Sequence, residues 1–317
     1  MTAIQRKKRA AAEWATQRER SSVFMLRLMT WISLRMGRPL ARVVLHGIAL
    51  YFYSFAPAAR RASYAYLQRA LGRKPNWRDC YKHFFTFAAT IHDRVYLLNQ
   101  RFDLFSITVH GEVELQAILK QGNGIFLLGA HFGSFEIVHA LGQQQPGLRM
   151  ALAMFEDNAR KITAALEAIN PAMRQEIIPL GHIDTMLQVQ DRLSSGALIG
   201  MLADRSLQQD AALTLDFLGA SAQFPLSSMR LAAVLRQRVF FMSGEYLGGN
   251  RYEIHFEPIA DFSEIARGKR EQAVALAVTE FSRRLEQHCR SEPYNWFNFF
   301  DFWKTARLAS AVDQKPS

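Results

Sequence analysis

The sequence predicts an α/β fold: a mostly parallel, mixed sheet flanked by helices, preceded by a helical N-terminal segment. Two observations support this prediction. Short apolar runs alternate with amphipathic stretches over most of the 317 residues, and basic residues concentrate near the N-terminus. Alternating strands and helices are typical of a sheet covered on both faces. With 49% hydrophobic residues, the chain is long enough and apolar enough to bury a large core.

The N-terminal quarter is basic and rich in bulky apolar residues. Residues 1–82 contain 17 Lys and Arg but 3 Asp and Glu, whereas the remainder contains 22 basic and 25 acidic residues. Arginines interleaved with Trp, Phe and Leu suit an anionic membrane surface, where guanidinium groups bind lipid phosphates. The alternative is a basic solvated face over an ordinary core. Nucleic acid is disfavoured as a partner, because neither a zinc finger nor an RNP aromatic motif is present.

Residues 43–59 contain no Lys or Arg, but this stretch is shorter than the ~20 apolar residues that a spanning helix needs. We therefore expect in-plane or shallow insertion here. Cys80 and Cys289 lie in no paired motif, so neither a disulfide framework nor a zinc site is expected, and a reducing compartment fits.

The later elements follow from apolar periodicity and turn residues. Helices are predicted over 77–98, 158–170, 183–196, 227–238 and 269–290. Buried strands are predicted over 124–130, 148–154, 176–180 and 197–203, and an antiparallel pair over 239–247 and 251–259, joined by Gly-Gly-Asn. We divide the chain into a helical membrane-associating segment (1–105), an α/β domain (106–304) and a tail (305–317).

Polar residues follow three of the predicted strands. The stretch from His131 to Glu136 follows the first, Asn158 and Arg160 follow the second, and Asp204 and Arg205 follow the strand over 197–203. Ligands of such sheets bind beyond the carboxyl ends of the strands. We therefore expect these residues to share one edge, although the sequence does not establish which of them are neighbours.

The segment HFGSFE (131–136) places a histidine, a glycine and a carboxylate close together after a predicted strand. Gly133 permits a tight turn, and Ser134 is a suitable N-cap for a following helix. Glu136 could then accept a hydrogen bond from one ring nitrogen of His131, leaving the other to take a proton from a hydroxyl. The alternative is a helix-capping histidine paired with a carboxylate for stability. Ser134 lacks the GxSxG context of a nucleophile, so capping is favoured for it.

The H-x4-E pattern of HFGSFE resembles the glycerolipid (lysophospholipid) acyltransferase superfamily. The order of further segments resembles its lipid A late-acyltransferase branch: FEDNAR (155–160), GMLADR (200–205), DFLGASAQFP (216–225) and PYNWFNFFDFW (293–303). The likeness covers about residues 20–304. Arg205 and the C-terminal segment depart from the lipid A pattern and look more like predicted acyltransferases of aryl-polyene or related pigment-lipid pathways.

The resemblance implies a glycerolipid acyltransferase-like fold and transfer of a fatty or aryl-polyene acyl chain to a lipid or glycolipid hydroxyl. The donor would be an acyl carrier protein or coenzyme A thioester, and the location the cytoplasmic face of the bacterial inner membrane. It implies no cofactor and no metal. An acyl-thioester hydrolase and a non-catalytic membrane scaffold remain alternatives.

The resemblance also assigns roles to residues. His131 would be the general base and Glu136 its orienter, with loop amides near Gly133 donating to the oxyanion. The implied substrate-binding residues are Gly133, Ser134, Asn158, Arg160, Asp204 and Arg205. Arg160 or Arg205 would hold a phosphate, the alternative for Arg205 being a salt bridge to nearby acids. The implied acyl-channel residues, for each of which core packing is the alternative, are Phe132, Phe135, Phe217 and Phe224.

Overall fold

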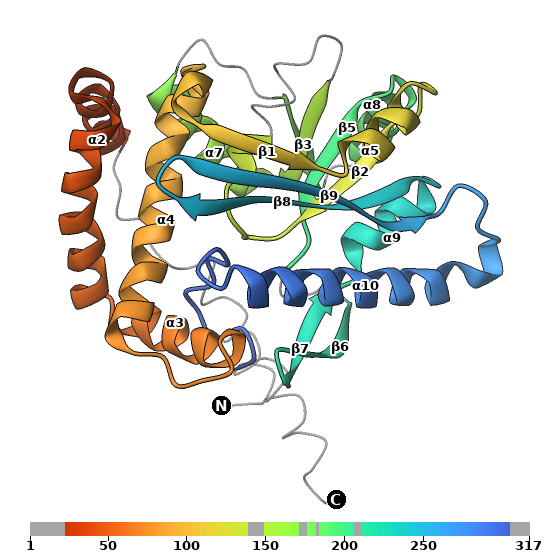
Figure 1. Ribbon diagram of the computed structural model, residues 1–317. Helices are drawn as coiled ribbons and strands as arrows, with labels where there is room; N and C mark the ends of the chain where they lie inside the picture. The colour runs from red at the N-terminus through yellow and green to blue at the C-terminus, as the bar shows by residue number, and fades with distance from the viewer. Residues whose placement is uncertain (1–22, 139–148, 171–175, 182–183, 206–210, 305–317) are drawn as a thin grey trace, which may run out of the picture.

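The computed structural model describes residues 23–138, 149–170, 176–181, 184–205 and 211–304. Its centre is a seven-stranded sheet in the order β1-β9-β8-β2-β5-β3-β4 (Figure 1). Its strands are β1 (Ser106–His110), β2 (Ile125–Gly129), β3 (Met150–Phe155), β4 (Glu176–Leu180), β5 (Leu198–Leu202), β8 (Arg238–Gly248) and β9 (Arg251–Asp261). All neighbours are parallel except β8 and β9, which form the predicted hairpin. The predicted mixed α/β fold is confirmed.

Helices cover both faces of this sheet. The helices with described bounds are α2 (Val23–Phe55, kinked at Gly37), α3 (Pro57–Ala70), α4 (Trp77–Leu98), α5 (Glu112–Leu119), α7 (Glu156–Ile169), α8 (Thr185–Ser194), α9 (Ser227–Val234) and α10 (Arg270–Ser291), with short 3-10 helices at Phe102–Leu104 and Arg267–Lys269. The helix predicted over 227–238 ends earlier, at Val234. Arg236 adopts a positive φ of 54°, and Arg238 already belongs to β8, so the chain turns directly into the next strand.

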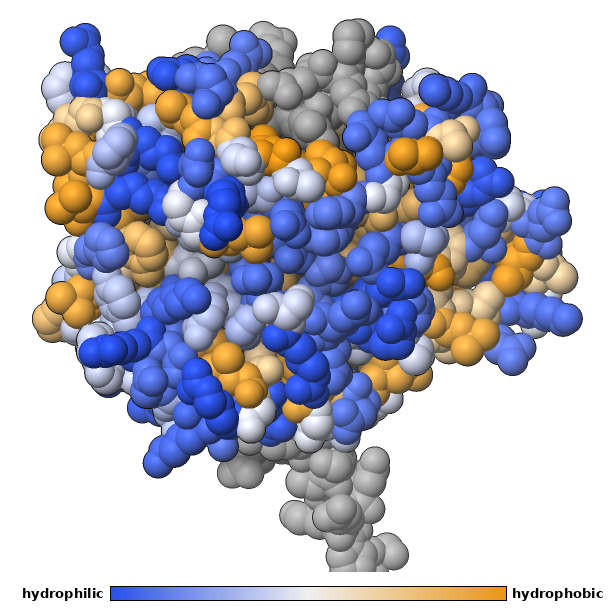
Figure 2. Space-filling model, in the orientation of Figure 1, coloured by the Kyte–Doolittle hydropathy of each residue, from blue (hydrophilic) through white to orange (hydrophobic). Residues whose placement is uncertain are grey.

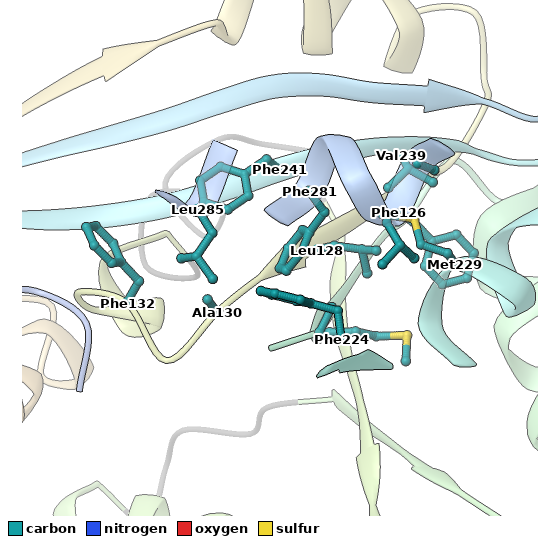
Figure 3. Close-up of a cluster of buried hydrophobic side chains, with 14 of the residues drawn as sticks. Phe126, Leu128, Ala130, Phe132, Phe224, Met229, Val239, Phe241, Phe281 and Leu285 are labelled. Carbon is teal, nitrogen blue, oxygen red and sulfur yellow. The ribbon is translucent and has the colours of Figure 1, made fainter. Parts of the chain in front are cut away.

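The core lies on both faces of β2, whose residues are all buried. Phe126 and Leu128 face a cluster that includes side chains from α9 and α10, drawn in Figure 3. Ile125 and Leu127 belong to a second cluster with residues of α4 and α5. This division follows from the alternation of side chains along a strand. A continuous apolar run in the sequence thus serves two layers of helices, as predicted for a strand covered on both sides.

The structure also contains elements that periodicity did not reveal. Strand β1 and helix α5 precede β2, and a separate hairpin is formed by β6 (Ala212–Phe217) and β7 (Ala220–Pro225). The hairpin turn has positive φ at both Leu218 and Gly219. Two consecutive residues with positive φ are typical of a tight hairpin turn. Leucine seldom adopts a positive φ, so the sequence did not indicate this turn.

The N-terminal helices pack onto the rest of the fold. Tyr66 and Leu67 of α3 and Cys80 of α4 are buried in the same cluster as Phe126, while α2 lies along α4 (Figure 1). Helix α4 begins with a capping box between Asn76 and Asp79. The first strand follows residue 105, but the helices before it share the core of the sheet. The tail from residue 305 lies outside the described residues.

The apolar stretch over 43–59 is not one helix, because α2 ends at Phe55 and α3 begins at Pro57. The ring of Pro57 disfavours helical geometry at the residue before it, and Ala56 accordingly has φ −117° and ψ 70°. No single described helix is long and apolar enough to cross a membrane; the two helices qualify only as a pair, bent by 96°. Apolar side chains at the surface of α2 include Trp31, Val43 and Phe55, and Figure 2 shows apolar surface over this helix at the left edge.

Candidate active site

The turn after β2 is held by a close approach of two backbones. Gly133 has φ 65° and pairs with Gly244 of β8 through an isolated bridge. A Cβ atom at Gly133 would lie 2.0 Å from the Gly244 carbonyl oxygen, so no larger residue fits without displacing the strand. The glycine in the motif therefore serves the expected tight turn and also a close contact with β8. A helix begins two residues later, at Phe135.

The parallel pairing of β2 and β5 brings His131 to Asp204. Gly129 pairs with Leu202, so the residues two positions further along each strand face one another. The His131 ring nitrogen Nδ1 donates to Asp204 Oδ1 at 2.8 Å, and the His131 backbone amide donates to Oδ2 at 3.1 Å. The expectation that polar residues after these two strands share one edge is confirmed.

The C-terminal segment completes this arrangement. Trp296 is fully buried, and its Nε1 donates to Asp204 Oδ2 at 3.1 Å. Its backbone forms a bridge with Phe132, flanked by hydrogen bonds from Phe297 N to His131 O and from Gly133 N to Asn295 O, both 2.8 Å. The carboxylate thus accepts three hydrogen bonds, and the histidine turn is fixed on two sides. Sequence reasoning placed the Trp-containing segment in the family pattern but did not assign Trp296 to the site.

The electrostatics of the pair favour a neutral histidine beside an ionised aspartate. Burial alone would raise the pKa of Asp204, but His131 and Arg205 hold it well below its usual range. Burial lowers the pKa of His131, as does the charge of Arg205, against the opposing effect of Asp204. Since Nδ1 donates to the carboxylate, Nε2 carries the lone pair. Among the described residues Nε2 has no hydrogen-bond partner, and the side chain is 33% exposed.

Glu136 is not the hydrogen-bond partner of His131, contrary to the prediction. Its Oε1 lies 2.6 Å from Nη2 of Arg94 on α4, and its Oε2 accepts a hydrogen bond from Ser134 Oγ at 3.3 Å. The bond from the ring goes instead to Asp204, because the β2–β5 register places that carboxylate directly beside the imidazole. Arg94 was missed because it lies in a helical stretch of the sequence with no motif around it.

Two of the loop amides near Gly133, which were expected to hold an oxyanion, are already engaged. Gly133 N donates to Asn295 O, and Ser134 N donates to Gly244 O at 2.7 Å. These bonds fix the turn, so neither amide is available to a substrate in this conformation. An oxyanion-binding role for other amides near Gly133 stays a prediction.

Arg205 follows Asp204 in the chain and contacts residues of the C-terminal segment. Its Nη2 donates to the Phe297 carbonyl at 3.1 Å, and its guanidinium carbon lies 5.0 Å from the centre of the Phe300 ring. Its Nε is buried without a hydrogen-bond partner among the described residues. Arg205 therefore contacts a carbonyl and an aromatic ring, and its expected binding of a phosphate stays a prediction.

The other expected site residues are core side chains or remain outside the description. Phe132, Phe217 and Phe224 are buried, which fits the alternative of core packing; Phe132 and Phe224 are seen within the core in Figure 3. Phe135 is half-buried against Gly200. Ser134 is buried beside Glu136. Asn158 and Arg160 belong to α7, but their side chains lie outside the described residues.

The likeness to known proteins lies at the level of the family. No curated protein matches the chain. The family model for bacterial lipid A biosynthesis acyltransferases matches residues 12–305 and so covers the strands, the histidine turn and the Trp296 segment. The chain belongs to the bacterial lipid A biosynthesis acyltransferase family.

Proposed function

We propose that this acyltransferase moves an acyl chain from a thioester to the hydroxyl of a lipid acceptor, with His131 as general base and Asp204 as the residue that orients it. One observation carries the proposal. Nδ1 of His131 is bound to a buried carboxylate, while the side chain remains partly exposed and Nε2 has no described partner. A histidine held in this way can accept a proton at a defined position.

The proposed reaction uses the acceptor's oxygen as the nucleophile. Nε2 of His131 takes the hydroxyl proton while the oxygen attacks the thioester carbonyl, and the imidazolium that forms is stabilised by Asp204. When the tetrahedral intermediate collapses, the carbon–sulfur bond breaks and the thiolate takes the proton from His131. An ester and a free thiol result, so the base is regenerated without a covalent enzyme intermediate.

We assign Glu136 a positioning role in this scheme. Its ion pair with Arg94 links the first turn of the helix after His131 to α4, and both side chains are about one-fifth exposed. A pair at this depth fixes the helix that follows the catalytic turn. Asn158 and Arg160 stay predicted substrate-binding residues. The partly exposed Arg205 is proposed to bind an anionic part of donor or acceptor with its guanidinium group.

We further propose that the donor is an acyl carrier protein or coenzyme A thioester and that the enzyme works at the cytoplasmic face of the bacterial inner membrane. The exposed apolar side chains of α2 and the basic N-terminal quarter support attachment to anionic lipid. The acyl chain is proposed to be fatty or aryl-polyene, since Arg205 and the segment after Trp296 depart from the lipid A sequence pattern.

The test is lipid mass spectrometry of cells that produce the wild-type protein or single variants. His131→Ala should reduce acylated product by at least about 10²-fold, the contribution of a general base. Glu136→Gln should have a smaller effect, and Glu114→Gln, an exposed change on α5, should have none. Near-normal product from a folded His131→Ala protein would overturn the assignment.

Assays of the purified wild-type protein, with and without lipid acceptor, distinguish the alternatives. Acyl transfer requires that thioester consumption depend on the acceptor and yield an acylated lipid. Release of free acid independent of acceptor would identify a hydrolase. If the purified protein consumes no thioester, although cells that contain it form the acylated product, the protein would be a scaffold.

A further inference from the structure

A second group of ligand-type side chains lies where β1 pairs with β9. His110 is the last residue of β1 and is directly paired with His255 of β9. Glu253 lies two positions before His255, so both side chains project from the same face of the sheet. Parallel pairing therefore brings two imidazoles and one carboxylate together. The group includes neither His131 nor Asp204.

The distances within this group suit a metal ion better than hydrogen bonds. Glu253 Oε2 lies 3.6 Å from His110 Nε2 and 3.5 Å from His255 Nε2. Hydrogen bonds between such atoms are normally 2.7–3.2 Å long. Donor atoms about 2.1 Å from a tetrahedral zinc ion are separated by about 3.4 Å. The three ligand atoms all lie within 4.8 Å of one another.

His255 has an unsatisfied ring nitrogen. Its Nε2 is buried and has no hydrogen-bond partner among the described residues. Buried polar atoms without a partner are costly and uncommon, so this one requires an explanation. A neutral imidazole nitrogen is a preferred ligand of zinc.

The surroundings carry an excess of negative charge. Glu245 Oε2 of β8 lies 3.8 Å from His255 Nε2, and Glu257 lies on β9 two positions after His255. Both ring nitrogens of His288 bind carboxylates, Nδ1 to Glu245 and Nε2 to Glu257 at 3.2 Å, an arrangement that suits the protonated ring. With Glu253, three carboxylates of the described chain therefore lie around the group beside the cations His288 and Arg284, and Arg284 pairs with Glu257 at 2.8 Å. A divalent cation would meet a net attraction at this position.

We propose that His110, Glu253 and His255 bind a zinc ion, with water as the fourth ligand on the exposed side of His110. The two imidazole rings are stacked, with centroids 4.6 Å apart. Binding requires the His110 ring to rotate until its lone pair points at the ion, and its half-exposed side chain can do so. The ion would fasten the edge strand β1 to β9. Sequence spacing did not indicate this site, because its ligands come from strands that lie far apart in the chain.

Metal titration of the full-length protein tests the proposal. Chelator-treated protein in detergent should bind one equivalent of Zn²⁺, and Mg²⁺ should not compete because it prefers oxygen ligands. Co²⁺ in place of zinc should give the visible absorption bands of a tetrahedral site. Zinc should raise the melting temperature of the wild type, because it binds only the folded chain.

His110→Ala should weaken zinc binding by more than the about 10–100-fold that loss of an outer partner causes, and it should abolish the cobalt bands and the thermal shift. Glu253→Gln, which keeps the shape of the side chain but removes its charge, should weaken zinc binding similarly. His46→Ala removes a histidine elsewhere, on α2, and should leave binding unchanged. Unchanged affinity in His110→Ala, or absence of stoichiometric zinc in the wild type, would overturn the proposal.

Discussion

At the scale of single residues, the environment of His131 determines how it can act. Asp204 binds one ring nitrogen and Trp296 holds Asp204, so the imidazole has one orientation and one tautomer. Burial and Arg205 keep the pKa of His131 below its ordinary 6.5 despite the carboxylate. A base must be neutral to accept a proton. The enzyme should therefore retain its base in mildly acidic solution.

This arrangement predicts a specific pH dependence for Asp204→Asn. Wild-type kcat/KM should rise with pH to a plateau, as His131 loses its proton. The variant loses the negative charge that raises the pKa of His131, so the rising limb should move to lower pH. The plateau should fall by about 10²–10⁴-fold, because an amide stabilises neither the right tautomer nor the imidazolium.

Asp191→Asn on the exposed surface of α8 is the matched control and should reproduce the wild-type profile. A merely structural role for Asp204 would lower the rate without moving the limb. Acyl transfer assayed across pH on folded protein separates these outcomes.

At the scale of elements, His83 joins α3 and α4 to the C-terminal segment. Its Nε2 donates to Trp296 O at 2.8 Å, and its Nδ1 accepts from Ser63 Oγ at 2.9 Å. Both nitrogens are thus satisfied in the neutral form. Burial lowers the pKa of His83 to about 4, against the opposing effect of the Trp296 carbonyl. The junction between the N-terminal helices and the site therefore depends on a neutral histidine.

Stability should accordingly decline on acidification through this residue. Between pH 6.5 and about 4 the unfolded chain takes up a proton at His83 that the folded chain does not, so the free energy of unfolding falls with pH. The contribution between pH 7 and 5 is about 2 kcal/mol. His83→Gln should lower stability at pH 7 but show a correspondingly smaller decrease toward pH 5. Equal decreases in both proteins, measured by urea unfolding, would contradict this account.

At the scale of the whole molecule, one buried carboxylate attaches α2 to the rest of the fold. Asp93 of α4 pairs with Arg38 at 2.8 Å and Arg42 at 2.7 Å and accepts a hydrogen bond from Tyr252 of β9 at 2.9 Å. Its side chain is fully buried. Asp93→Ala should cost about 3–5 kcal/mol, since it leaves two largely buried cations without their partner.

Asp103→Ala supplies the control for Asp93→Ala. It breaks an ion pair with Arg101 in which both side chains are more than half exposed. Such pairs contribute about 1 kcal/mol or less. Chemical unfolding of both variants should therefore give clearly different losses; similar values would show that the Asp93 network does not hold α2 in place.

The exposed apolar surface of α2 predicts how the whole molecule meets a membrane. Phe55→Glu should weaken binding to anionic vesicles, because a charge replaces an apolar side chain that is 66% exposed. Leu276→Glu on α10, where the leucine is 65% exposed, should leave binding unchanged. Deleting the N-terminal helices is a poorer test, because it would also remove Tyr66 and Leu67 from the core.

Co-sedimentation of the protein with anionic vesicles, at increasing salt concentration in the buffer, provides the measurement. Attachment through the basic segment should weaken as salt screens the charges. Equal binding by Phe55→Glu and Leu276→Glu would place the contact elsewhere on the surface. Binding that does not respond to salt would favour insertion of the bent α2–α3 pair.

Much of the architecture was determined by the sequence alone. The apolar runs of β2 and β5, the Gly-Gly-Asn turn and the alternation with helices are local patterns, and local patterns report strands, turns and layers. They also placed His131 and Asp204 at the same edge of the sheet, because the carboxyl ends of parallel strands share an edge. The ordered segments around them were sufficient to suggest the family.

Only the tertiary structure decided which side chains meet. His131 and Asp204 are 73 residues apart, and their contact depends on the β2–β5 register, which no local pattern encodes. The nearer acid, Glu136, was the obvious partner in sequence but binds Arg94 instead. The sequence likewise did not indicate that Trp296 binds Asp204. From the sequence, residues can be assigned to the same edge of the sheet. Which of them touch is decided by strand register and by packing between segments that lie far apart in the chain.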